Sequence, residues 1–240
     1  MILQNKNVLI TGASGGLGRS LAFSYQRMGC NLILTGRKLE VLQTLHSDLS
    51  KVNSLTTVTH IKCDLGDESS VYRLIKDVKD RLGRVDVLVN CAGVFPIDTI
   101  HDMSIEAYSK CIRVNLTVPF ILSKEFSREM IEAGWGRIVN IASSSAYGGS
   151  PKTSAYCASK HGLLGLSRSL HKELKDQGVR VLCVSPGSIK TEMGKEVEKL
   201  GQRFDTFMDP DEVADYIVYN TALNKDMISE EIKLNRIFVQ

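Results

Sequence analysis

Three side chains in the middle of the sequence could exchange a proton with a bound substrate. Tyr156 and Lys160 stand four residues apart in a segment with helical periodicity, so they share one face of the expected helix. A phenol has a pKa of ~10, and a nearby ammonium is expected to lower it, which would make the pair a general acid or base. Ser143 ends an apolar run, and its hydroxyl could hold a carbonyl oxygen where negative charge develops.

A glycine-rich turn follows the first apolar run. It leads into a segment of helical periodicity and reads TGASGGLG over residues 11–18. Gly12 allows a tight turn, Gly16 lets the backbone approach a ligand, and Gly18 allows close packing of helix on strand. The free N–H groups and positive dipole end of that helix suit a pyrophosphate, so the turn predicts a dinucleotide site.

The end of the second apolar run predicts which dinucleotide binds. Folds that bind NAD commonly place an acidic residue here, which bonds the ribose 2′-hydroxyl. This chain has Gly36 followed by Arg37, and a planar guanidinium can clamp a 2′-phosphate with two hydrogen bonds. NADP(H) is therefore the preferred cofactor and NAD(H) is possible. The simpler interpretation is a solvated arginine at the start of a helix.

Strand-like and helix-like segments alternate along the chain and must position these residues. The apolar runs predict strands at residues 7–11, 31–35, 57–63, 85–90, 137–142 and 179–184, with a seventh edge strand at 231–239. Periodicity near 3.6 predicts helices at residues 17–28, 38–50, 68–82, 104–133 and 154–176, and the capping pattern at 209–212 starts a last helix. The order predicts one α/β domain over residues 1–240, a Rossmann-type doubly wound parallel sheet with helices on both faces.

Composition excludes several other classes of protein. The 240 residues are 43% hydrophobic and 24% charged, which is typical of a globular domain rather than a disordered chain. The net charge of +3 does not indicate a nucleic-acid partner. No run approaches the ~20 apolar residues of a membrane span and no leader segment is evident, so we expect a cytoplasmic protein without a membrane partner. The six cysteines and five histidines show no ligand spacing, which predicts no metal site.

At this point the chain resembles the short-chain dehydrogenase/reductase family, and most closely its 3-oxoacyl-[acyl-carrier-protein] reductase branch. The resemblance rests on residues 11–18, 90–93 and 185–191 together with Asp64, Asn115, Ser143, Tyr156 and Lys160. It implies an NAD(P)-dependent oxidoreductase with a catalytic tetrad of Asn115, Ser143, Tyr156 and Lys160. Asn115 would kink its helix and position a water that connects the lysine to bulk proton supply.

The resemblance also implies a set of cofactor contacts. Asp64 and Leu65 would contact the adenine, Asn90 and Gly93 the adenosine ribose side, and residues 186–191 the nicotinamide end. The full implied set is Gly12, Ser14, Gly15, Gly16, Leu17, Gly18, Arg37, Asp64, Leu65, Asn90, Ala92, Gly93, Tyr156, Lys160, Pro186, Gly187, Ile189 and Thr191.

Two features leave the substrate open. The C-terminal residues 228–236 depart from the glycine-rich ending usual in the reductase branch, and residues 188–208 could form either a substrate lid or an ordinary amphipathic helix. The leading prediction is reduction of a small-molecule or carrier-linked ketone. The alternatives are a dehydrogenase of a sugar, a nucleotide-linked sugar or another polyol, and a catalytically silent dinucleotide-binding regulator. The helices at 104–133 and 154–176 are expected to pair in a homodimer or homotetramer.

Overall fold

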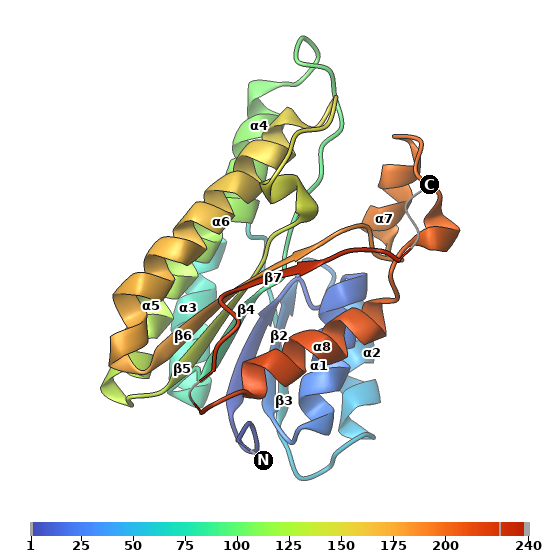
Figure 1. Ribbon diagram of the computed structural model, residues 1–240. Coiled ribbons are helices and arrows are strands. Elements are labelled where there is room, and N and C mark those ends of the chain that lie inside the picture. Colours follow the sequence, from blue (N-terminus) through green and yellow to red (C-terminus); the bar gives the residue numbers. More distant parts are fainter. Residues whose placement is uncertain (1, 226, 238–240) are drawn as a thin grey trace.

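The computed structural model describes residues 2–225 and 227–237, and these form one sheet of seven parallel strands in the order β3-β2-β1-β4-β5-β6-β7 (Figure 1). Each strand before β7 is rich in Val, Ile and Leu because both faces of the sheet are covered by helices. The strands are β1 Asn7–Thr11, β2 Asn31–Gly36, β3 Val58–Lys62, β4 Val87–Asn90, β5 Gly136–Ile141, β6 Val179–Pro186 and β7 Glu231–Leu234. The predicted doubly wound parallel fold is confirmed.

Two apolar cores fill the space between the sheet and its helices. One face is covered by α1 (Gly16–Arg27), α2 (Leu39–Ser50) and α8 (Pro210–Ala222), whose buried side chains include Leu21, Leu42 and Val213. The other face carries α3 (Glu68–Leu82), α4 (Ile105–Ile112), α5 (Val118–Glu132) and α6 (Ser154–Leu174) (Figure 1). None of the described helices is long and apolar enough to cross a membrane.

The single helix predicted at residues 104–133 is wrong in its middle. The segment is α4 followed by a π-helical turn, Arg113–Thr117, and then α5. Pro119 supplies the physical reason, because it has no N–H to donate to the Asn115 carbonyl four residues earlier and its ring crowds that carbonyl. The wider turn therefore falls on Asn115.

The last predicted strand is shorter than expected. β7 pairs with β6 from Glu231 to Leu234 and ends there, whereas the sequence predicted a strand to residue 239. After Leu234 the chain leaves the sheet and reaches Thr206 through Arg236, so pairing with β6 cannot continue. Residues 238 and 239 lie outside the described residues.

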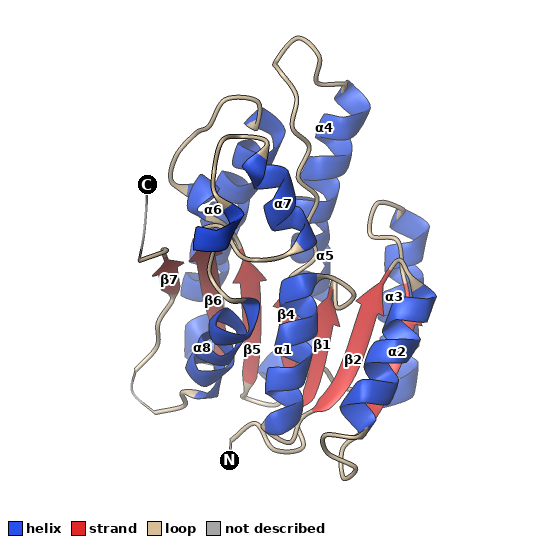
Figure 2. Cartoon of the chain, turned by 90° about the vertical axis from the view of Figure 1, so that its right-hand side faces the viewer, coloured by secondary structure: helices blue, strands red, loops and turns tan. Residues whose placement is uncertain are grey.

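The carboxyl ends of the parallel strands meet at one edge of the sheet, where parallel α/β folds place their ligands. The glycine-rich turn after β1, the loops after β4 and β5, and the segment after β6 all lie there. Above this edge stands α7 (Glu192–Glu198), as Figure 2 shows. The edge therefore brings together segments that are far apart in the sequence.

Candidate active site

A cavity of about 570 Å³ opens at this edge of the sheet. Its lining contains most of the residues that the sequence singled out. These are Gly12, Ser14, Gly15, Gly16, Leu17, Gly18, Arg37, Asp64, Leu65, Ala92, Gly93, Ser143, Tyr156, Lys160, Pro186, Gly187, Ile189 and Thr191. Asn90 and Asn115 do not line the cavity.

The glycine-rich turn forms a cradle that fits a pyrophosphate. Gly12 has a φ of +69°, and a Cβ there would lie 2.7 Å from the Ala92 Cα. A Cβ on Gly18 would lie 2.3 Å from the Gly12 carbonyl oxygen, so only glycine permits this packing. The N-terminus of α1 begins after Gly15 and receives no side-chain cap within the described chain. Its N–H groups are thus left for an anionic ligand.

The adenosine end of the cradle lacks the carboxylate that would select NAD. Gly36 ends β2, and a Cβ there would lie 2.7 Å from the Ser14 hydroxyl oxygen, so a larger side chain would displace Ser14. Arg37 and Lys38 follow directly and both line the cavity. Two cations and a hydroxyl at this position suit a phosphate.

Asn90, which does not line the cavity, makes side-chain hydrogen bonds within the fold. Its side chain is buried, and its Nδ2 donates to Asn140 Oδ1 at 2.8 Å. Asn140 Nδ2 in turn donates to the Ser167 hydroxyl at 2.9 Å. The side chain of Asn90 therefore joins β4, β5 and α6, and its contact with the adenosine ribose side stays a prediction.

Tyr156, Lys160 and Ser143 meet at the other end of the cavity. Tyr156 and Lys160 lie one turn apart on α6, with the Lys160 Nζ 5.5 Å from the centre of the Tyr156 ring. Both side chains are buried, and Nζ donates to the Ile141 carbonyl at 2.7 Å. Ser143 follows β5, and its hydroxyl accepts a hydrogen bond from the Ser145 N–H at 3.1 Å.

The pKa of the tyrosine differs from the sequence-based expectation. Burial raises the pKa of Tyr156 to about 12, although the neighbouring Ser143 hydroxyl lowers the value in part. Burial also lowers the pKa of Lys160 to about 8. The predicted lowering of the phenol pKa toward neutrality is wrong here, because desolvation of the phenolate dominates.

Asn115 is held from three sides behind the cavity wall. Its Oδ1 accepts from the Val94 N–H at 2.9 Å, and its Nδ2 donates to the Val94 carbonyl at 3.0 Å. The same Nδ2 donates to the Ser159 hydroxyl at 3.0 Å, and that hydroxyl donates to the Tyr156 carbonyl at 2.7 Å. Ser159 thus ties the π-helical turn to the helix of the tyrosine.

Sequence reasoning missed Ser159 and also Phe95. The Phe95 ring packs edge-to-face on Tyr156, with centroids 4.6 Å apart and planes at 74°. The position of Ser159 three residues after Tyr156 was a usable signal, because residues at that spacing lie on the same face of a helix. Nothing in the sequence around Phe95 indicated its contact, which joins a loop after β4 to α6.

The segment between β6 and α8, which we call the lid, borders the cavity. A backbone bridge between Ile189 and Met208 closes its base, and α7 contributes Met193 and Val197 to the cavity wall. The far end of the lid is tied to the C-terminal segment: the Arg236 guanidinium donates to Thr206 Oγ1 at 2.9 Å and to Gln202 Oε1 at 3.1 Å. It also lies 5.2 Å from the centre of the Phe207 ring.

The described residues contain no cluster of three or more His, Cys, Asp or Glu side chains that could hold a metal ion.

A model of the short chain dehydrogenase family matches residues 6–200. The chain belongs to that family. It is therefore an oxidoreductase that uses NAD(H) or NADP(H), and the prediction of family and enzyme class is confirmed.

Relatives of this short-chain dehydrogenase carry different names. The 3-oxoacyl-[acyl-carrier-protein] reductase of Rickettsia conorii is 36% identical over 201 residues, which are 84% of this chain and 78% of the relative. The D-beta-hydroxybutyrate dehydrogenase of Rhizobium meliloti is 35% identical over 187 residues, 78% of this chain and 72% of the relative. A solved metagenomic short-chain oxidoreductase in complex with NADP is 29% identical, with a TM-score of 0.86 over 100% of both chains.

Proposed function

We propose that this short-chain dehydrogenase reduces a ketone to a secondary alcohol with NADPH, and that Tyr156 is the general acid. The proposal is carried by one observation: Tyr156, Ser143 and Lys160 meet at one end of a cavity whose other end is a dinucleotide cradle. The Ser143 hydroxyl lies near enough to the Tyr156 hydroxyl to lower the pKa of the phenol, so both hydroxyls can reach the same substrate oxygen.

The reaction assigns a separate task to each side chain. The reduced nicotinamide, when bound, supplies the hydride that adds to the carbonyl carbon. The Ser143 hydroxyl donates a hydrogen bond to the carbonyl oxygen, and the Tyr156 hydroxyl gives that oxygen its proton. A phenol pKa of about 12 keeps Tyr156 in its donor form at neutral pH.

Lys160 and Asn115 act through the tyrosine. With a pKa of about 8, Lys160 is mostly charged at neutral pH, and its ammonium stabilises the phenolate left after proton transfer. Lys160 would also hold the nicotinamide ribose. The Asn115 carbonyl, which cannot receive a hydrogen bond from Pro119, would hold the water that restores the proton.

The preference for NADPH rests on Arg37. Arg37, Lys38 and Gly36 line the part of the cavity where the 2′-phosphate would lie. The similar metagenomic oxidoreductase was solved with NADP, which supports the same choice here. Asp64 and Leu65 would contact the adenine, and residues 186–191 the nicotinamide end.

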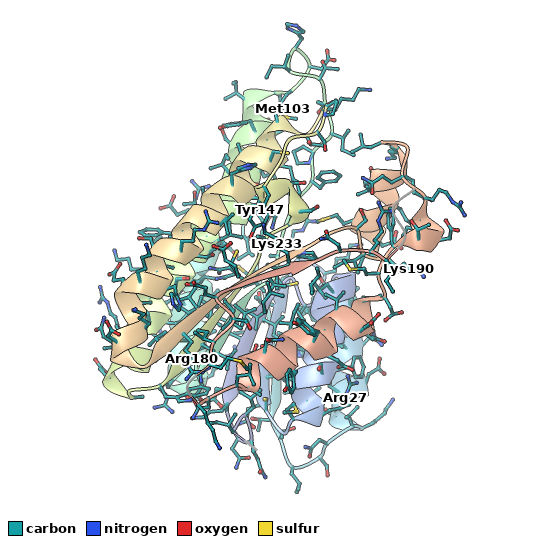
Figure 3. All side chains as sticks on the ribbon, viewed as in Figure 1. Arg27, Met103, Tyr147, Arg180, Lys190 and Lys233 are labelled. Carbon is teal, nitrogen blue, oxygen red and sulfur yellow. The ribbon has the colours of Figure 1, made fainter. Side chains whose placement is uncertain are left out.

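The deciding experiment is single-turnover reduction by Tyr156→Phe. We expect the rate to fall by at least the ~10²–10⁴-fold typical of a lost general acid, with NADPH affinity unchanged. Tyr147→Phe is the matched control, because the Tyr147 hydroxyl bonds Glu231 at 3.0 Å and its ring lies against Lys233 outside the cavity (Figure 3). If Tyr156→Phe keeps most of the activity, another group donates the proton and the assignment fails.

A further inference from the structure

The charged side chains around the cavity are distributed unevenly. Within the described part of the chain, the lining includes Arg37, Lys38, Asp64, Lys110, Lys160 and Glu192 as its charged members. The first three follow β2 and β3 at the adenosine end. Lys110 belongs with them, because a Cβ added at Gly66 would lie 3.7 Å from its Cε and 3.2 Å from Asp64 Oδ1.

The two remaining charged residues do not offer a cation to a substrate anion. Lys160 directs its Nζ to the Ile141 carbonyl behind Tyr156. Glu192 is an anion with an 87% exposed side chain, paired with Lys195 at 2.6 Å.

The cations near the lid either point into solvent or are paired with other side chains. Lys152 and Lys190 are exposed and do not line the cavity; Figure 3 labels Lys190. Arg203 pairs with Asp205 at 2.6 Å, and Arg236 is held by Thr206 and Gln202. In the described chain, the part of the cavity beside Tyr156 is therefore bordered by uncharged groups apart from Lys160 and the exposed Glu192.

Those uncharged groups divide into two kinds. Val94 and Phe95 from the loop after β4, with Met193, Val197 and Leu200 from the lid, form an apolar wall. Ser145, Ser150 and Thr153 lie on the segment between β5 and α6, and Thr153 already donates its hydroxyl to the Ser150 carbonyl at 2.8 Å. Such a wall gains free energy from an apolar substituent, while an unpaired carboxylate there would lose its hydration without compensation.

We propose that the substrate is an uncharged ketone with an apolar arm, and that the site discriminates against ketones that carry a free carboxylate or phosphate. The inference rests on the proposed function, since it describes what Tyr156 protonates. The apolar arm lies between Phe95 and the lid, and the serine-rich segment faces the polar part of the substrate.

The test compares each ketone with its own acid under saturating NADPH. Ethyl acetoacetate and acetoacetate share the reacting carbonyl and differ in the carboxylate, and ethyl levulinate and levulinate form a second pair. We expect kcat/KM to favour each ester by at least about 100-fold, because the acid must bury an unpaired charge. We also expect kcat/KM to be higher for ethyl 3-oxohexanoate than for ethyl acetoacetate, because its apolar arm is longer. The kcat/KM for an N-acetylcysteamine thioester, compared with that for the ethyl ester, distinguishes a carrier-linked substrate from a free one.

A variant that adds a positive charge to the cavity wall tests the same inference by changing the protein instead of the substrate. Met193→Arg places a cation on the apolar wall and should raise kcat/KM for acetoacetate at least about 10-fold. The ratio of kcat/KM for ethyl acetoacetate to kcat/KM for acetoacetate should therefore fall. Met227→Arg is the matched control, because Met227 is 63% exposed and does not line the cavity.

Each outcome is decisive. Equal kcat/KM for ester and acid, with NADPH-dependent reduction of both, overturns this inference and leaves the proposed function intact. Reduction of the acid alone overturns it in the same way. Failure of every ketone to consume NADPH, with the cofactor bound, overturns the proposed function and this inference with it.

Discussion

At the scale of single residues, Arg37 is where cofactor choice can be changed most directly. Arg37→Asp should remove a charge-assisted contact of roughly 1.5–3 kcal/mol and repel the 2′-phosphate, so the preference for NADPH over NADH should invert or vanish. The measurement is kcat/KM for both cofactors at fixed ionic strength. Arg73→Asp makes the same charge change at a side chain that is 70% exposed and outside the cavity lining, and should change neither value. Equal use of both cofactors by the unaltered enzyme would contradict the assignment.

Ser159 offers a second test at this scale, because α6 contains its matched control. The Ser159 hydroxyl donates to Tyr156 O at 2.7 Å and accepts from Asn115 at 3.0 Å. The Ser167 hydroxyl donates to Leu163 O at 2.7 Å and accepts from Asn140 at 2.9 Å. Both alanine variants should lower the free energy of unfolding by about 1–3 kcal/mol, since each leaves a buried amide less well paired.

Activity should separate the two variants. Ser159→Ala frees Asn115 from the tyrosine helix, and we expect kcat to fall about 10-fold with little change in KM. Ser167→Ala should keep the kcat of the unaltered enzyme. Similar losses of kcat in both variants would mean that Ser159 acts on stability alone.

At the scale of elements, the π-helical turn has an identifiable cause in Pro119. Pro119→Ala restores an N–H that can bond the Asn115 carbonyl, so the turn should relax toward regular α-helix and stability should hold or rise. We expect kcat to fall about 10-fold or more, because Asn115 would shift from Val94 and Ser159. Steady-state kinetics and thermal unfolding check this. Pro210→Ala, at the first turn of α8, is the control that should leave kcat unchanged.

The elements also show what the sequence can and cannot predict. Strands such as β1 were predicted to the residue, and Asp209 caps α8 through the N–H groups of Asp211 and Glu212 as its pattern indicates. Local patterns succeed there because the hydrogen bonds and apolar faces concerned lie within one element. The periodicity alone missed the π-helical turn, because it is continuous on either side, and the kink at Asn115 was expected only from the family resemblance.

In the candidate site too, features that lie within one segment were predicted, and features that depend on distant segments were not. The glycine turn, Tyr156 and Lys160 are recognisable because their spacing within one segment determines their chemistry. Phe95 and Arg236 were missed because each depends on a contact with a distant segment, and the bond from Asn90 to Asn140 was not predicted for the same reason. The pKa of Tyr156 was misjudged for a related reason: its burial comes from loops that the spacing of two residues does not contain.

At the scale of the whole molecule, we expect a dimer or tetramer. The outer face of α4 and α5 exposes Ile105 at 80%, Tyr108 at 41% and Phe120 at 48%, and a Cβ added at Gly165 on α6 would meet nothing within 4 Å. Light scattering at micromolar concentration should give a multiple of 26.5 kDa. Phe120→Glu should reduce that mass, whereas Tyr219→Glu, an exposed aromatic on α8, should not. A mass near 26.5 kDa for the unaltered protein would contradict the expectation.

The attachment of the lid to Arg236 has a consequence for the timing of turnover. The family match ends at residue 200, and the groups that hold the far end of the lid, Gln202, Thr206, Phe207 and Arg236, all lie beyond it. In enzymes closed by a lid, its opening often limits the release of product. We therefore expect the contacts of Arg236 to affect how quickly product leaves the site rather than the proposed reaction itself.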